Sequence, residues 1–562
     1  MLLAGCGLPG AWAEQAQWRI LDTGFASGVD FLAAWRAWKD DPQRPRMLHY
    51  AAIAARPVRP EDLRRGAASL PELQLLAAEL AAQCWGLLPG FHRLSFEGGR
   101  VLLTLCVGDA AAMLRELRCT ADSVFLGVGC GLDIAKAVAR LCRRGTGIAT
   151  LALPNDTLRE LAQLGFRMQQ HSTGLRGTYD PAWEPKVRGD ASEQQQPGRC
   201  AVIGGGLAGA AAAASLARRG WQVQVLDAHT APAQGTSSLP AGLMAPHQSP
   251  DDNLLSRLTR AGVRITLAQC EALLHGGQDW QRSGALEHRL GDPRPVPNLG
   301  DGGEAWACTA DARRKMGAGL AESDQAWWHA AAAWIKPAAL VNAWLAQPGI
   351  TWRGGVAVRG IVRDTDGWGV VDAQGADCAR ADLVVVAAAL GSAALLDQRL
   401  TLHPVRGQVS WGRHDGMAQL PPWPLNGHGH FLPSVPLADG MAWLSGSTYG
   451  RGETETDIRP ADQQANLERL GQLAPRAAAS LQAQFARGEV NAWTGVRCAS
   501  RDRRPLVGLL ESGLAVSTAM GSRGLTFAAL CAELLAARLH GEPAPLPGRL
   551  ADALDAARLL PG

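Results

Sequence analysis

The chain has 562 residues, of which 47% are hydrophobic and 19% charged, and its formal net charge is +3 at pH 7. This length exceeds one ordinary core and indicates at least two domains, while the composition excludes a mainly disordered chain. The small net charge excludes a protein that binds polyanions over its whole surface, so any nucleic-acid contact must come from local basic clusters.

The first third of the chain alternates short apolar runs with helix-like stretches. Alternation of this kind predicts a mostly parallel α/β sheet. A helix is expected over 61–85. The runs that are typical of buried strands are 18–21, 46–53, 101–107, 123–128 and 147–153.

A polar segment, PKVRGDASEQQQPG at 185–198, has the composition of an interdomain linker. It predicts a first domain over 1–184 and a second over 199–562. Strands at 200–203, 382–387 and 514–517 are expected in the second domain, followed by a helix at 525–540.

The second domain opens with a dinucleotide fingerprint, VIGGGLAG, between a strand and an Ala-rich helix. Gly204 permits the tight turn, Gly206 lets a pyrophosphate approach the backbone, and Gly209 lets helix and strand pack closely. Asp227 ends the next strand, where a carboxylate accepts hydrogen bonds from ribose hydroxyls. The fingerprint alone is compatible with FAD and with NAD.

Four further segments resemble the D-amino-acid oxidase and glycine oxidase group of flavoenzymes. They are GTSSLPAGLMAP at 235–246, ADLVVVAAALGS at 381–392, HPVRGQ at 403–408 and GSRGLTFAALCAELLAARLHGE at 521–542. The resemblance implies an FAD-binding Rossmann domain with an inserted α+β substrate domain, which oxidises a carbon next to an amine nitrogen. FAD does the redox chemistry in such enzymes, so the protein has to position the substrate.

The resemblance also directs attention to a loop and to several arginines. Gly521, Arg523 and Gly524 form a turn at a helix N-terminus, where N–H groups and the Arg523 charge stabilise negative charge on a reduced flavin. We expect this loop and the 204–209 turn to line one site. A substrate with an N-linked glycine needs an arginine for its carboxylate. The candidates are Arg406, Arg497, Arg501 and Arg503.

Both halves together resemble the bifunctional MnmC family of tRNA-modification proteins. The supporting segments are WRILDTGFASGVDFL at 18–32, LPGFHRL at 88–94, GLMAPHQSPDDNLLSRLTRAG at 242–262 and GVRCASRDRRPLVG at 495–508. The resemblance implies that the FAD domain converts the carboxymethylaminomethyl side chain of a wobble 2-thiouridine to aminomethyl. The first domain, a class I methyltransferase-like Rossmann-type fold, then methylates the amine from S-adenosylmethionine.

The first domain keeps part of the family's cofactor motif and departs from the rest. Asp22, Gly24, Gly28 and Asp109 stand at the positions expected for S-adenosylmethionine. Ala26 replaces a glycine of the loop, and Ala54 replaces the glutamate for the ribose. Gly127 replaces the aspartate that the family has beside the methyl-accepting amine, which predicts weak or lost methyl transfer.

Three alternatives to this interpretation stay open. Both activities are retained if other residues compensate, or the first domain is a non-catalytic tRNA-docking module. Alternatively, the protein is an oxidase of free small amines or amino acids.

We expect no metal site, because the cysteines show no metal-binding spacing. We expect no membrane span, because no run of about 18 uncharged apolar residues occurs. Twelve scattered cysteines favour reduced thiols in the cytoplasm. The basic stretches that motivate docking are Arg56, Arg59, Arg64 and Arg65, and Arg140, Arg143 and Arg144.

Overall fold

The computed structural model describes residues 2–171, 174–185, 195–292, 294–414, 416 and 418–560. They form two compact units, and the predicted α/β class is confirmed. The first unit comprises Met1–Gln196, Gly300–Gly302 and Ala536–Asp552. The second comprises Pro197–Leu299, Gly303–Leu535 and Ala553–Gly562. Residues 186–194 of the predicted linker lie outside the described part of the chain.

The first unit is built on an eight-stranded sheet in the order β3-β4-β2-β1-β5-β6-β8-β7. Neighbouring strands from β4 to β6 are parallel, so the order reverses at β1, with β2 on one side and β5 on the other. The strands are β1 (Gln17–Asp22), β2 (Met47–Ala54), β3 (Gly90–Phe96), β4 (Val101–Val107), β5 (Ala121–Phe125), β6 (Cys142–Thr150), β7 (Phe166–His171) and β8 (Gly174–Tyr179). All five predicted runs form strands of this sheet, with some ends shifted.

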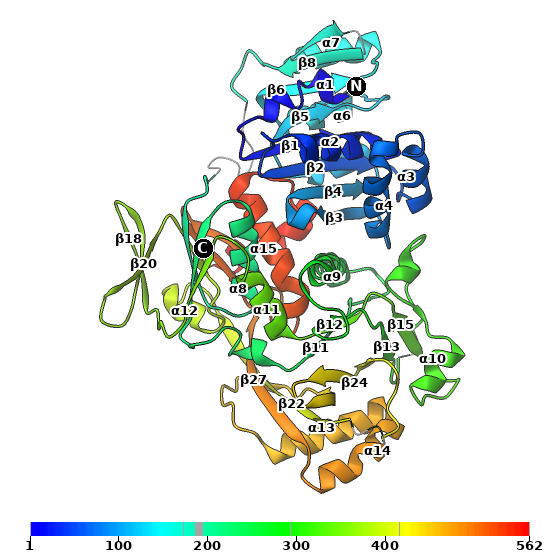
Figure 1. Cartoon of the computed structure of the whole chain (residues 1–562), viewed down its shortest axis with the longest axis vertical. Coiled ribbons are helices and arrows are strands. Elements are labelled where there is room, and N and C mark those ends of the chain that lie inside the picture. The colour runs from blue at the N-terminus through cyan, green and yellow to red at the C-terminus, as the bar shows by residue number, and fades with distance from the viewer. Residues whose placement is uncertain are drawn as a thin grey trace. The chain divides into compact units, whose positions relative to one another are not determined.

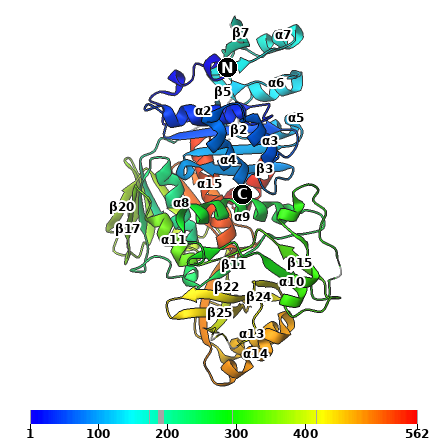
Figure 2. The ribbon, with the colours of Figure 1, turned by 45° about the vertical axis from the view of Figure 1, so that its right-hand side comes forward.

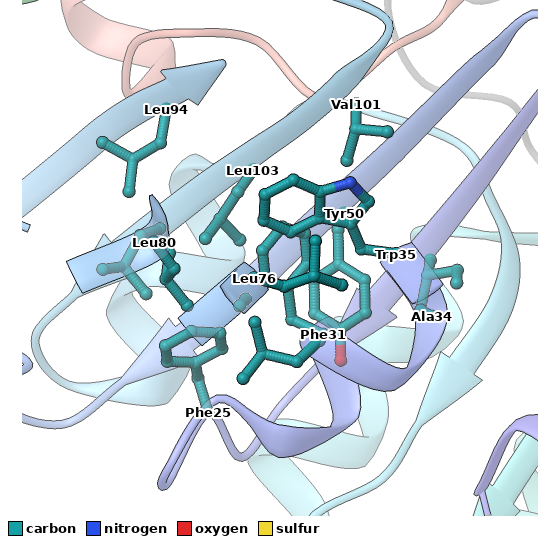
Figure 3. Close-up of a cluster of buried hydrophobic side chains, with 14 of the residues drawn as sticks. Phe25, Phe31, Ala34, Trp35, Tyr50, Leu76, Leu80, Leu94, Val101 and Leu103 are labelled. Carbon is teal, nitrogen blue, oxygen red and sulfur yellow. The ribbon is translucent and has the colours of Figure 1, made fainter. Parts of the chain in front are cut away.

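Alternate residues of these strands face two different cores, because side chains alternate along a strand. Tyr50 packs with α2 (Val29–Asp40) and α4 (Gln74–Gln83) on one face, as the labelled side chains in Figure 3 show. Ile53 packs with α5 (Ala110–Glu116), α6 (Leu132–Ala139) and α7 (Asn155–Gln163) on the other. The sheet is therefore doubly wound.

The single helix expected over 61–85 is wrong. The structure has α3 (Pro60–Gly66), a 3₁₀ turn η2 (Pro71–Leu73) and then α4. Pro71 opens the 3₁₀ turn, and a proline cannot continue a helix because it lacks the N–H and clashes with the preceding turn.

The C-terminal segment Ala536–Asp552 is an integral part of the first unit. Glu542 is 2% exposed, and its Oε1 lies 3.5 Å from Nε2 of the buried His49. Arg93 donates to the carbonyl of Pro543, and Arg118 forms an ion pair with Asp552 at 2.6 Å. Residues of the sheet unit are thus contacted by residues 434 and 450 positions away in the chain.

The second unit contains a six-stranded sheet in the order β17-β10-β9-β21-β29-β28. It is parallel except for the pairing of β28 with β29. The predicted strands at 200–203, 382–387 and 514–517 are its three central strands. The strands are β9 (Arg199–Ile203), β10 (Gln222–Leu226), β17 (Ile350–Arg353), β21 (Leu383–Val386), β28 (Leu506–Glu511) and β29 (Leu514–Thr518).

Helices and a small meander cover the two faces of this sheet. α8 (Leu207–Arg218) packs on β9, β10 and β29, and the predicted C-terminal helix is α15 (Gly524–His540). The meander β18 (Gly360–Asp364), β19 (Gly367–Val371) and β20 (Asp377–Ala381) extends to one side in Figure 1. Trp368 and Val370 of β19 share a core with the sheet.

A mixed nine-stranded sheet is the other large sheet of the second unit. Its central strands are β22 (Leu402–Arg413), β24 (Gly429–Leu437) and β25 (Gly440–Gly446), with β27 (Asn491–Ser500) paired along β22. α13 (Pro460–Leu473) and α14 (Pro475–Ala486) lie together beside these strands, as Figure 2 shows. This sheet with its helices is the α+β insertion.

The described residues contain neither a membrane-spanning helix nor a metal-binding cluster. No helix there has the length and apolarity that a membrane crossing requires. No three His, Cys, Asp or Glu side chains of the same residues are grouped so that they could hold a metal ion.

Candidate active site

The turn between β9 and α8 is shaped by three glycines. Gly204 has φ +112°, and a Cβ there would lie 2.5 Å from the carbonyl oxygen of Ala387. A Cβ on Gly209 would lie 1.9 Å from the carbonyl oxygen of Gly204. Gly206 is the N-cap of α8, so the backbone reaches the helix N-terminus with no side chain in the way. The turn therefore presents N–H groups and the positive end of a helix, a combination that binds phosphate.

Asp227 follows β10 and is held beside this turn. Its Oδ2 accepts a hydrogen bond from the Gly205 N–H at 2.6 Å, and its Oδ1 accepts one from the His229 N–H at 2.8 Å. The side chain remains 17% exposed. A carboxylate has about four acceptor positions, so Asp227 keeps capacity for hydroxyl donors.

A cavity of about 920 Å³ extends from the glycine turn to the loop between β29 and α15. Gly204, Gly206 and Asp227 line it at one place, and Gly521, Arg523 and Gly524 at another. Gly521 adopts φ +57°, and its N–H donates to the Cys498 carbonyl at 2.8 Å. The structure thus brings the two separately predicted loops to a single cavity, whose size suits a dinucleotide and a small substrate group.

Two arginines bring positive charge to this cavity. Arg497 on β27 donates to Ser447 Oγ at 2.6 Å, and its Cζ lies 4.7 Å from the ring centroid of Tyr449. Burial lowers the pKa of both Arg497 and Arg523, and neither forms an ion pair with a carboxylate in the described residues. A half-buried arginine stays charged and favours an anionic ligand.

Two neutral histidines line the same cavity. Burial, with a smaller contribution from Arg497, lowers the pKa of His430 to about 4. Its Nε2 is buried and has no hydrogen-bond partner in the described part of the chain. Burial also lowers the pKa of His247, helped by Arg523. The sequence analysis missed both histidines and Tyr449, although the segment NGHGH at 426–430 offered a signal.

Three of the four candidate arginines, Arg406, Arg501 and Arg503, do not line the cavity. Arg406 is 1% exposed, pairs with Asp462 and donates to the Glu455 carbonyl at 3.0 Å. Its guanidinium therefore holds the segment around Glu455 and Asp462 against β22 of the insertion. Arg503 is exposed on the loop after β27, as is Arg501. Of the candidates, Arg497 alone appears among the residues that line the cavity.

In the first unit the strand order reverses at β1, so the carboxyl ends of β1 and β5 lie side by side at one edge of the sheet. Asp22 is 3% exposed there and accepts from the Gly24 N–H at 2.8 Å and the Tyr50 hydroxyl at 2.9 Å. Burial raises the pKa of Asp22 to about 7. Both carboxylate oxygens of Asp22 are thus engaged within the protein.

The other residues predicted for S-adenosylmethionine have structural roles. Gly28 has φ +72° and caps α2, where a Cβ would lie 2.9 Å from Leu63 Cδ2. Asp109 is exposed and caps α5 by accepting from the Ala112 N–H at 2.8 Å. After β5, a Cβ on Gly127 would lie 3.2 Å from the Cα of Gly24. The two glycines therefore meet backbone to backbone.

Comparison with known proteins agrees with this geometry. Residues 199–538 match the family described as DAO, FAD dependent oxidoreductase. A protein of Polaromonas naphthalenivorans named tRNA 5-methylaminomethyl-2-thiouridine biosynthesis bifunctional protein MnmC is 50% identical over 99% of this chain and 92% of its own length. A protein of the same name from Ralstonia nicotianae is 36% identical over 100% of this chain and 92% of its own.

Solved structures resemble the second unit in fold. Glycine oxidase from Bacillus cereus aligns over 65% of this chain and 99% of its own, with a TM-score of 0.51 and 21% identity. L-proline dehydrogenase from P. horikoshii aligns over 65% and 98%, with a TM-score of 0.53 and 16% identity. At these identities the likeness concerns the fold alone.

Proposed function

Because the chain belongs to the MnmC family and, through residues 199–538, to the FAD dependent oxidoreductases, we propose that it modifies the wobble uridine of tRNA. The proposed reaction removes the carboxymethyl group of 5-carboxymethylaminomethyl-2-thiouridine by oxidation and leaves 5-aminomethyl-2-thiouridine. The observation that carries this proposal is one cavity that joins the dinucleotide turn to Arg497, which has no carboxylate partner among the described residues. The cytoplasm, where tRNA is found, is the proposed compartment.

The cavity residues suit FAD. Gly204 and Gly206 leave the backbone open to the two phosphates, and Asp227 has acceptor capacity for the ribose hydroxyls. Gly521, Arg523 and Gly524 would lie along the ring system, where the Arg523 charge favours electron-rich states. When bound, FAD supplies the acceptor for a hydride from the carbon next to the amine nitrogen.

Arg497 is the residue that we assign to the substrate carboxylate. Its guanidinium is fixed by Ser447 and by the ring of Tyr449, so it is oriented before the substrate arrives. A carboxylate pairs with such a planar guanidinium through two parallel hydrogen bonds. The neutral His430 beside Arg497 adds no second positive charge, and its free Nε2 can accept a hydrogen bond from the substrate amine.

The proposed reaction balances without a further protein reactant. The N–CH₂ unit of the N-linked glycine loses two electrons and two protons and becomes a C=N bond. Water then adds to that carbon, the C–N bond breaks, and the products are the primary amine on the nucleoside and glyoxylate. The cavity walls would hold the amine carbon in place beside the cofactor.

We assign the oxidase to 199–562 and the family's second activity, methylation from S-adenosylmethionine, to a first domain over 1–184. The oxidation is the activity that we propose for this chain. The runner-up is oxidation of a free amino acid, favoured only by the glycine oxidase fold.

The test uses purified full-length protein and tRNA that carries the carboxymethylaminomethyl nucleoside. We expect the protein to be yellow and to convert that nucleoside to aminomethyl, as read by mass spectrometry of the digested tRNA. Arg497→Ala should retain the flavin and lose most of the conversion. Protein that binds no FAD on reconstitution, or that turns over free glycine or sarcosine but not tRNA, would contradict the proposal.

A further inference from the structure

In a doubly wound sheet, a nucleoside cofactor binds outside the carboxyl ends of the strands at the point where the strand order reverses. In the first unit these are the carboxyl ends of β1, β2 and β5. From the residues found there, we infer that this chain does not transfer a methyl group and that the primary amine is its final product. This inference rests on the proposed oxidation, which makes that amine.

Methyl transfer to an amine makes two demands on the protein. The sulfonium donor has to be held by its ribose, for which an acid at the end of the second strand is the usual partner. The amine nitrogen forms a bond to the methyl carbon as the C–S bond breaks, and the ammonium that results must lose a proton. An alkylammonium has a pKa of about 10, so a nearby acceptor is required before the nitrogen can attack.

The ribose partner is missing at the end of β2. Ala54 is the last residue of that strand and is 3% exposed, and Ala55 and Arg56 follow it. The next acids along the chain are Glu61 and Asp62 in the first turn of α3, and Asp62 lies 3.3 Å from Arg65. The end of β2 therefore carries the methyl side chain of Ala54 and the positive charge of Arg56, where a carboxylate would be needed to bind the ribose.

The proton acceptor is missing at the end of β5. Residues 125–131, FLGVGCG, contain no acid, histidine or lysine. Burial raises the pKa of the Cys130 thiol to about 11, so that side chain remains protonated. The Gly127 N–H donates to Thr23 Oγ1 at 2.9 Å, and this bond ties the loop against β1.

The space for an acceptor at position 127 is also reduced. A Cβ there would come 3.2 Å from Gly24 Cα and 3.4 Å from Gly24 N, so a larger residue would displace backbone. Asp22, an acid of the same edge, already accepts from Gly24 and Tyr50 and is nearly inaccessible. The residues at the ends of β2 and β5 do not fit S-adenosylmethionine with an amine acceptor.

The experiment has two arms with the full-length protein. In the first, tRNA with the carboxymethylaminomethyl nucleoside is incubated with FAD and S-adenosylmethionine, and we expect the aminomethyl nucleoside to accumulate. Unchanged substrate would overturn the proposed oxidation. Appearance of the methylaminomethyl nucleoside would overturn the present inference instead.

The second arm measures methyl transfer separately, so that its result does not depend on the oxidation. tRNA that already carries the aminomethyl nucleoside is incubated with S-adenosylmethionine labelled in its methyl group. The 50% identical Polaromonas naphthalenivorans relative serves as the comparison protein. We expect label transfer to be about 100-fold slower or more than with the relative, in line with loss of an acid–base group. A rate within tenfold of the relative overturns the inference. Equilibrium dialysis of labelled S-adenosylmethionine, at a concentration that saturates the relative, should show no binding to this chain.

Discussion

Arg497 is the residue whose surroundings most directly indicate a ligand. Its guanidinium faces a cavity, contacts a hydroxyl and an aromatic ring, and has no carboxylate partner among the described residues. We predict that Arg497→Ala lowers kcat/KM for the tRNA substrate about 10- to 150-fold, because a charge-assisted hydrogen bond of about 1.5 to 3 kcal/mol is lost. Steady-state kinetics measure this effect.

The matched control for this variant is Arg503→Ala, which removes the same charge from an exposed position outside the cavity. We expect its kcat/KM to stay within twofold of the unaltered protein. Equal losses in the two variants would mean that the arginines act only through long-range attraction of tRNA.

Asp22 gives a pH-dependent prediction for stability. Burial raises its pKa from 3.8 to about 7 in the folded protein, so the folded state holds this proton more tightly than the unfolded state. The contribution to stability is therefore complete below pH 3.8 and is lost as the pH rises through about 7. We predict that the free energy of unfolding falls by about 1 kcal/mol more between pH 6 and 8 than in Asp22→Asn. Urea titrations at the two pH values measure the difference. The exposed cap variant Asp109→Asn should leave the pH dependence unchanged.

The sequence could not rank the four candidate arginines, because each stands in a polar segment of similar composition. The burial and the hydrogen-bond partners of each arginine distinguish them in the structure. Arg406 pairs with Asp462 and donates to backbone carbonyls, whereas Arg497 donates to Ser447 and faces the cavity. His430 was overlooked for the same reason. Its role depends on neighbours from β27, about 70 residues away in the chain.

Elements whose features are local in the chain were predicted well. The strand, glycine turn and helix at 199–218 have features that are largely local, such as the approach of Gly209 to the Gly204 carbonyl, and they appear as expected. The mixed nine-stranded sheet was not predicted strand by strand, since β22 pairs with β25 and with β27 far along the chain. Pairings of this kind leave only a weak trace in local hydrophobic pattern.

The contact between turn and helix at 204–209 yields an element-scale prediction. In Gly209→Ala the new Cβ would lie 1.9 Å from the Gly204 carbonyl oxygen, so α8 must move away from the turn. We expect the variant to lose flavin, measured as flavin absorbance per protein after gel filtration. Gly235→Ala, which also lines the cavity but meets no atom within 4 Å, should keep its flavin. Loss of flavin in both variants would contradict this account of the turn.

At the scale of the whole molecule, charge bears on tRNA binding. The net charge is only +3, so affinity for phosphates must come from particular arginines. Arg56 and Arg64 are exposed and form no ion pair with the described residues. We predict that the double variant Arg56→Gln, Arg64→Gln reduces the slope of log affinity against log salt by about one to two, as expected when two phosphate contacts are lost.

The control for charge alone is the double variant Arg501→Gln, Arg503→Gln, which removes two exposed arginines from the second unit. Filter binding of tRNA at several salt concentrations measures both. A slope that changes equally in the two double variants would show that Arg56 and Arg64 contact tRNA phosphates no more than other exposed arginines do. Deletion of residues 1–190 is a poor substitute, because it would also leave Ala536–Asp552 without its partners.

The first unit is built from both the N-terminal part of the chain and Ala536–Asp552, and this affects its folding during synthesis on the ribosome. The β-sheet of the first unit is translated within the opening third of the chain, yet its partners Glu542, Pro543 and Asp552 emerge last. Before those residues are synthesised, His49, Arg93 and Arg118 cannot form these contacts. One side of the nascent sheet therefore lacks its C-terminal partners during most of elongation. A stop codon near the end of the gene would therefore harm the first part of the protein as well as the last.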